Sequence, residues 1–99
     1  MEPELIADLS LYDSDGSRRR GPILDRFRCP CFVQKDTAPG GWDCLVLLGE
    51  APLALGETRR VRFLFMSGQK AIEVMRQAGR FYLWELGFIG EAVVVDPKP

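Results

Sequence analysis

Three cysteines are the residues of this chain best suited to chemistry, because a thiolate can attack an electrophile or bind a metal ion. Cys29, Cys31 and Cys44 together offer three ligands to zinc. A closed structural zinc site needs four ligands, and its cysteines usually come in Cys-x-x-Cys pairs. Cysteines two positions apart share one face of a strand, and cysteine is a frequent core residue. We therefore expect free thiols in the core, without a disulfide or a metal ion.

Histidine is absent from the sequence, which removes several catalytic designs at once. The chain cannot build a Ser-His-Asp triad, a Cys-His pair, a histidine metal site or an imidazole proton relay. Asp13 and Asp15 flank Gly16 as in a calcium loop, but the bidentate glutamate that ends such a loop is missing. The sequence therefore predicts no metal ion, no cofactor and no catalytic residue, and we expect a protein that is not an enzyme.

The charge of the chain is nearly balanced, with 13 Lys and Arg against 14 Asp and Glu. A domain that binds nucleic acid without sequence preference normally carries a clear positive excess. Basic side chains still gather in two groups, which are Arg18, Arg19 and Arg20 with Arg26 and Arg28, and Arg59, Arg60 and Arg62. Either group can bind phosphate or simply face solvent beside acidic residues. Nucleic acid is thus a less favoured partner than protein.

Apolar residues recur at every second position through most of the sequence, which is the period of half-buried β-strands. This pattern predicts six strands, at residues 4–12, 25–33, 42–48, 58–65, 80–84 and 88–95. Because Pro30 lacks an amide hydrogen, the second strand should lie at a sheet edge or carry a bulge. The third strand is apolar on both faces and is expected to be buried on both sides. From Gly68 to Ala78 the period becomes helical, which predicts either one short helix or a loop over a barrel end.

The length of the chain suffices for one domain, residues 1–99. Six short strands with at most one short helix indicate an all-β fold, and we predict a six-stranded antiparallel closed barrel, which has no exposed sheet edge. The polar segment 13–22 should be a flexible loop and residues 96–99 a frayed tail. No apolar run is long enough to span a membrane, and the acidic N-terminus does not resemble a secretory signal. We therefore expect a cytoplasmic protein without membrane association.

Three segments of the sequence resemble the C-terminal β-barrel domain of translation elongation factor Tu. DSDGSRRRGPILDRFRCPCFV is similar to that family's acidic, glycine-rich loop and the following strand, with Phe27 and Arg28 at its Tyr-Arg positions. LALGETRRVRFLF resembles the turn before a valine-rich strand, with Gly56 and Glu57 at the Gly-Asp positions. GRFYLWELGFIGEAVVV resembles the family's last hairpin; its matching residues are Arg80, Phe81, Glu85, Gly90 and Val93. The order and spacing hold over about residues 7–95.

The resemblance implies a six-stranded barrel like that of small bacterial stand-alone relatives of the factor. It does not carry over the GTPase, because the chain has no Gly-x-x-x-x-Gly-Lys-Ser/Thr phosphate loop. In the parent family this barrel packs on the GTPase domain, contacts the T stem of aminoacyl-tRNA and helps to receive the exchange factor. Here Leu86, Gly87 and Phe88 replace a Gly-Gly-Arg turn, and Trp84 stands in place of an arginine. An apolar rim favours a protein partner over an RNA backbone.

The aromatic residues of the fifth predicted strand define a candidate surface. If Phe81 and Leu83 face the core, Tyr82 and Trp84 face outward, although packing under the helical segment is the competing interpretation. We predict a partner-binding surface of Tyr82 and Trp84 flanked by the cationic strand, with these candidate residues: Tyr82, Trp84, Arg60, Arg62, Arg18, Arg19 and Arg20. The leading hypothesis is a non-enzymatic binding module for a protein or ribonucleoprotein. The alternative is a small enzyme or ligand-binding protein that uses Glu73, Glu85 or a cysteine in a cleft beside the barrel.

Overall fold

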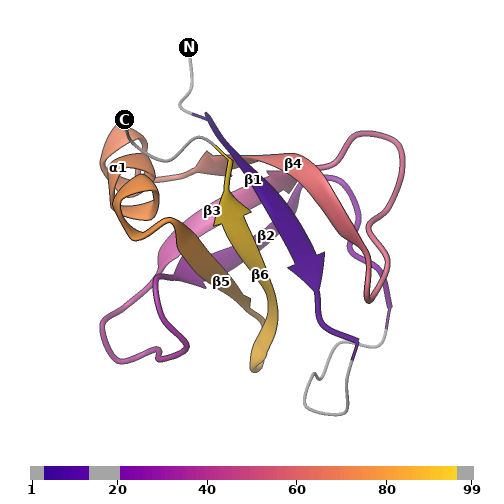
Figure 1. Cartoon of the computed structure of the whole chain (residues 1–99), viewed down its shortest axis with the longest axis horizontal. Helices are drawn as coiled ribbons and strands as arrows, with labels where there is room; N and C mark the ends of the chain where they lie inside the picture. Colours follow the sequence, from indigo (N-terminus) through magenta and orange to yellow (C-terminus); the bar gives the residue numbers. More distant parts are fainter. Residues whose placement is uncertain (1–3, 14–20, 96–99) are drawn as a thin grey trace.

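The computed structural model describes residues 4–13 and 21–95, which form a closed antiparallel β-barrel with one helix (Figure 1). The strands are β1 (Glu4–Leu11), β2 (Phe27–Phe32), β3 (Trp42–Leu47), β4 (Thr58–Phe65), β5 (Arg80–Trp84) and β6 (Phe88–Val94), and the helix is α1 (Gln69–Ala78). Around the barrel they follow the order β1-β4-β3-β2-β5-β6, and β6 pairs with β1 to close it. The predicted six-stranded closed barrel is confirmed. Most of the predicted 13–22 loop and the predicted tail lie outside the described residues.

The interior of the barrel is filled by the apolar face of each strand. Leu5, Ala7, Leu9 and Leu11 of β1 are at most 2% exposed, as their alternation predicts. The rings of Phe63 and Phe65 each meet Phe81 edge to face, with centroids 5.0 and 5.8 Å apart. Among the described residues no polar or charged side chain is buried. The interior is therefore a packed hydrophobic core.

Both ends of the barrel are closed. The helix α1 joins the end of β4 to the start of β5 and buries Ala71, Ile72 and Met75, so it covers that end (Figure 1). The segment from Gly68 to Ala78, for which the sequence predicts either a helix or a loop, thus forms a helix. The helix ends at Gly79, which has a left-handed backbone conformation (φ 80°). At the opposite end, where β2 begins and β3 ends, Ile23 and Leu53 form an isolated bridge and are fully buried.

Two local predictions need correction. β2 is not an edge strand, because it pairs with β3 on one side and with β5 on the other. Its pairing with β5 involves only Cys31 and Phe32, so Pro30 lies just outside that ladder. The register shift of the β5–β6 ladder falls between Leu83 and Trp84, and not at Pro30, where a bulge was the other predicted possibility.

The third strand was expected to be buried on both sides, yet only one of its faces is buried. Cys44 and Val46 are fully buried, whereas Leu45 and Leu47 are half-exposed on the outside of the barrel. Within the described ranges, no helix is long and apolar enough to cross a membrane.

Candidate functional site

The outward orientation predicted for Tyr82 and Trp84 is confirmed. Phe81 and Leu83 are fully buried in the barrel, and the two aromatic residues that alternate with them are half-buried on the outer face of β5. Because successive side chains of a strand point to opposite faces, neither Tyr82 nor Trp84 belongs to the interior core. They are the starting point of the candidate site.

An aromatic cluster surrounds Tyr82 on this outer face. Tyr82 pairs with Phe32 across the β2–β5 ladder, and Phe88 meets both rings edge to face, with centroid distances of 6.3 Å to Tyr82 and 5.8 Å to Phe32. Phe32 is only 7% exposed because the backbone at Gly41 lies against its ring. A Cβ at Gly41 would approach that ring to 2.7 Å, so glycine is needed for this contact. The aromatic residues therefore already pack on one another in the free chain.

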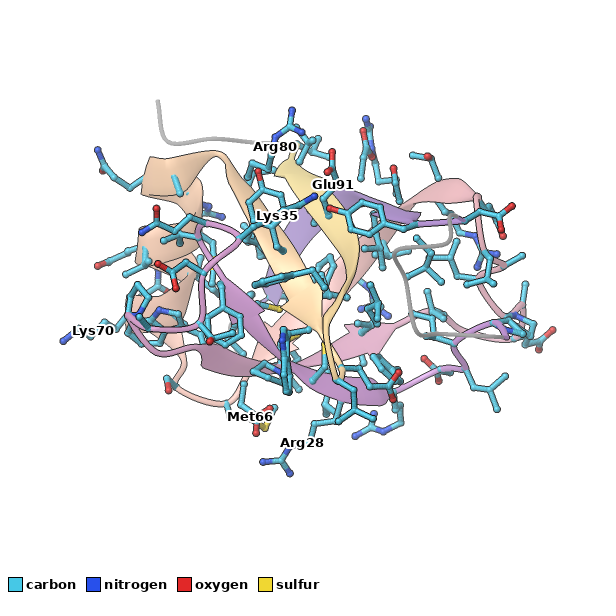
Figure 2. All side chains as sticks on the ribbon, turned by 90° about the horizontal axis from the view of Figure 1, so that it is seen from below. Arg28, Lys35, Met66, Lys70, Arg80 and Glu91 are labelled. Atoms are coloured by element: carbon cyan, nitrogen blue, oxygen red, sulfur yellow. The ribbon has the colours of Figure 1, made fainter. Side chains whose placement is uncertain are left out.

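A polar network forms one border of the cluster (Figure 2). The Tyr12 hydroxyl donates to Glu91 Oε1 at 3.0 Å, and Arg80 Nη1 donates to Glu91 Oε2 at 2.7 Å. The Lys35 ammonium lies 4.6 Å from the centre of the Tyr12 ring and 5.6 Å from that of Tyr82. Partial burial raises the pKa of Tyr12, and contact with the Tyr12 hydroxyl raises that of Lys35. Tyr12 thus stays protonated and Lys35 charged.

No pattern in the sequence indicates this network. Lys35 lies in a turn-rich segment and Tyr12 at the end of the first predicted strand, and nothing in their spacing links them to Glu91. They meet because β6 pairs with both β1 and β5, which places Glu91 opposite Ser10 and opposite Tyr82. Only the barrel ladder brings these side chains together.

The hairpin between β5 and β6 forms the other border. Leu86 at its tip is 70% exposed and has a left-handed backbone (φ 56°), which is uncommon for a leucine. Trp84, at the base of the hairpin, is paired with Phe88 across β5 and β6. We call Phe32, Tyr82, Trp84, Leu86 and Phe88 together the β5 wall.

The predicted cationic flank is wrong. In the ring of six strands β4 lies three positions from β5 in either direction, so Arg60 and Arg62 lie on the opposite side of the barrel from Tyr82 and Trp84. The structure does not bring the two groups together. Strand order in a barrel depends on the crossover connections, which alternation in the sequence does not reveal. The other predicted cations, Arg18, Arg19 and Arg20, lie outside the described residues.

The β4 arginines are also paired with acids. Arg60 binds Asp8 at 2.9 Å and Arg62 binds Glu4 at 3.3 Å, both across the β1–β4 ladder. The hydrogen bond from Arg60 lowers the pKa of Asp8. These pairs are solvent-exposed. The basic group therefore faces solvent beside acidic residues and needs no functional explanation. A shallow hollow of about 320 Å³ lies beside them, lined by Ile6, Leu47, Leu48, Gly49, Arg59, Arg60, Val61 and Arg62.

The groups named for the enzyme alternative lie apart from the hollow beside the β4 arginines. Glu73 is exposed on α1, Glu85 lies in the β5–β6 hairpin, and neither they nor any cysteine line the hollow. Hydrogen bonds from Cys31 and Cys44 lower the pKa of Cys29 to about 5, yet this side chain is only 3% exposed. Burial raises the pKa of Cys31, and contact with Cys29 raises that of Cys44. The Cys29 side chain is therefore shielded from solvent.

Comparison with known proteins adds no family to these observations. No family model matches the chain, and no curated protein matches it either. The resemblance to the elongation factor Tu barrel therefore remains an expectation from the sequence, and the candidate site depends on the geometry of the β5 wall.

Proposed function

We propose that this chain is a non-catalytic binding module of the translation-factor barrel type, which docks onto a protein partner through the β5 wall. The observation that carries the proposal is Leu86, a large apolar side chain that is 70% exposed on a left-handed backbone. That conformation costs an L-residue about 1–2 kcal/mol, a cost that glycine does not incur. Strained backbone persists where the site has a use for it. A leucine held out at this position is suited to insertion into a partner.

The neighbours of Leu86 support an interface. Half-buried Trp84 and the ring of Phe88 flank the hairpin at positions paired across β5 and β6. Large aromatic side chains are enriched in the energetically dominant centres of protein interfaces. The aromatic cluster behind them is already ordered by mutual packing, so binding would cost little side-chain entropy.

The charges near the wall favour a protein over a nucleic acid. Arg28 donates from Nε to Asp43 Oδ2 at 2.8 Å, Arg80 is paired with Glu91, and Lys35 lies over two tyrosine rings. A phosphate backbone is bound mainly by cations free to replace its counterions. Mixed, paired charges around an apolar centre are instead typical of the polar rim of a protein interface.

The filled barrel supports a non-enzymatic role, because its interior holds only apolar side chains among the described residues and both ends are covered. The sequence resemblance supports a role related to translation in the bacterial cytoplasm. In such a role a ribonucleoprotein is the second class of partner, after a protein.

Quantitative capture tests the proposal. The tagged chain and four variants are used to capture partners from the source cells, with bound protein measured by mass spectrometry and bound RNA by sequencing. Leu86→Asn, which tolerates the left-handed backbone, and Trp84→Ala should reduce the captured partner by roughly 5- to 150-fold, the effect of removing an interface anchor. Ile6→Thr and Arg62→Ala, which alter exposed residues on other strands, are the matched controls and should leave capture unchanged. Equal loss in all four variants, or loss with Arg62→Ala alone, contradicts the proposal.

A further inference from the structure

The barrel brings all three cysteines together in one place. Cys29 and Cys31 of β2 and Cys44 of β3 point inward, and Cys29 is directly opposite Cys44 in the ladder. Their three sulfur atoms all lie within 4.8 Å of one another, and those of Cys31 and Cys44 are 3.1 Å apart. The spacing in the sequence predicted a shared face for Cys29 and Cys31 but did not place Cys44 beside them.

We propose that Cys29, Cys31 and Cys44 form a three-sulfur site for one trivalent metalloid of the arsenite or antimonite class. Sulfur ligands select soft, thiophilic elements. A three-bonded atom with a lone pair is pyramidal, so with bonds of about 2.3 Å, as in zinc thiolates, its sulfurs lie about 3.5 Å apart. The Cys31–Cys44 pair already lies within this distance, and side-chain rotations must bring the wider sulfur pairs closer to enclose such an atom. This inference goes beyond the proposed binding function and does not depend on the β5 wall.

The charge of the resulting complex decides which element fits. Three thiolates leave a zinc complex with a net charge of −1 and a copper(I) complex with −2, whereas a trivalent metalloid gives a neutral complex. The cysteines are at most 3% exposed, and no polar or charged side chain is buried among the described residues to offset a charge. Burying an uncompensated charge is costly. The apolar core therefore favours the neutral complex.

The number of ligands leads to the same choice. Zinc in a closed site takes four ligands, and the described residues offer three at this place. A trivalent metalloid forms three bonds and keeps a lone pair in the fourth direction, so three cysteines complete its coordination. Arsenite reaches the site as the uncharged acid As(OH)₃, which suits entry into an apolar interior.

The binding step balances without a redox partner. Three S–As bonds form while three As–O bonds break, and the three hydroxide groups leave as three waters. Two of them take the thiol protons of Cys31 and Cys44, and the third takes its proton from Cys29 or, where Cys29 is ionised, from solvent. Arsenic stays trivalent. Access requires local opening, and the β2–β5 seam is the place for it, because only Cys31 and Phe32 of β2 pair with β5 there. Openings of this kind involve few broken contacts and occur well below the free energy of global unfolding.

Titration of the reduced protein with arsenite tests the site. Native mass spectrometry should show one arsenic bound with the loss of three protons, and X-ray absorption should show three sulfur neighbours. At a hundredfold excess over Kd the Tm should rise by roughly 10 °C or more. Cys44→Ala, which keeps a small apolar side chain, should weaken binding at least about tenfold. Met75→Leu, which removes a buried sulfur but no thiol, should bind as the wild type does.

Several results overturn the proposal. If Cys44→Ala fails to fold, the wild-type protein alone decides the question. Absence of bound arsenic, or of three sulfur neighbours around it, then refutes the site. Tighter binding of zinc or copper(I) than of arsenite refutes the charge argument. Unchanged arsenite binding in a folded Cys44→Ala variant shows that the third thiol is not a ligand.

Discussion

Gly90 provides a sharp test of the closed barrel, because it lies where β6 packs against β1. A Cβ at this position would lie 2.6 Å from the backbone oxygen of Ser10 and 3.2 Å from Leu11 Cδ2. The nearest atom is backbone, so the Gly90→Ala variant can relieve the clash only by separating β1 from β6. Overpacking of this kind costs about 1–3 kcal/mol, and replacing glycine by alanine returns about 0.4–1 kcal/mol through the unfolded chain. We expect a net loss of about 1–2 kcal/mol.

Thermal unfolding measures this loss, with Gly21→Ala as the matched control. A loss of 1–2 kcal/mol corresponds to a fall in Tm of roughly 5–15 °C for a domain of this size. A Cβ at Gly21 meets no atom within 4 Å, so the control gains the same unfolded-state term without the clash and should unfold at the wild-type Tm or slightly above it. Equal Tm values for the two variants would refute the close β1–β6 packing and with it the closure of the barrel.

Three further predictions concern pH, thiols and nucleotides. The Asp25 carboxylate accepts the backbone N–H groups of Gly49 and Leu48, which lower its pKa below 3.8; its stabilisation is therefore complete above that value and is lost as the pH falls through the lowered pKa. Asp25→Asn should unfold at a lower Tm than the wild type near neutral pH, and the gap should close in Tm scans below about pH 4; a gap that stays constant contradicts this. The buried cysteines should react with a thiol reagent slowly in the native protein and rapidly after denaturation, whereas fast native labelling would place them outside the core. Equilibrium dialysis should detect no GTP binding, since the sequence has no phosphate loop, and saturable micromolar binding would disprove that expectation.

The strands could be predicted from the sequence because each has one apolar and one polar face. In β4, Val61, Phe63 and Phe65 alternate with Arg60 and Arg62, and this period of two fixes both the element and its inward side. The helix is harder to distinguish from a loop because its apolar face has only three buried residues. Short apolar repeats of this kind fit a helix and an irregular cap equally well.

The candidate site could be predicted only in part, because its members come from different strands. The outward position of Tyr82 follows from local alternation, but its distance from Arg60 depends on the barrel order, which no local pattern encodes. Tyr12 reaches Glu91, and Lys35 lies over the Tyr12 ring, only because β6 pairs with both β1 and β5. The exposure of Leu86 depends on the left-handed turn of its hairpin, which the sequence Glu85-Leu86-Gly87 does not specify.

Hydrogen exchange on the complex with its captured protein partner tests the β5 wall most directly. The account predicts added protection of backbone amides in residues 84–88 and in β2, with β4 unchanged, because β4 lies on the opposite side of the barrel. Exchange protection reports local opening and burial segment by segment, so the two surfaces are distinguishable. Protection confined to β4 or α1, with residues 84–88 exchanging as in the free chain, would contradict the central claim that the β5 wall binds the partner.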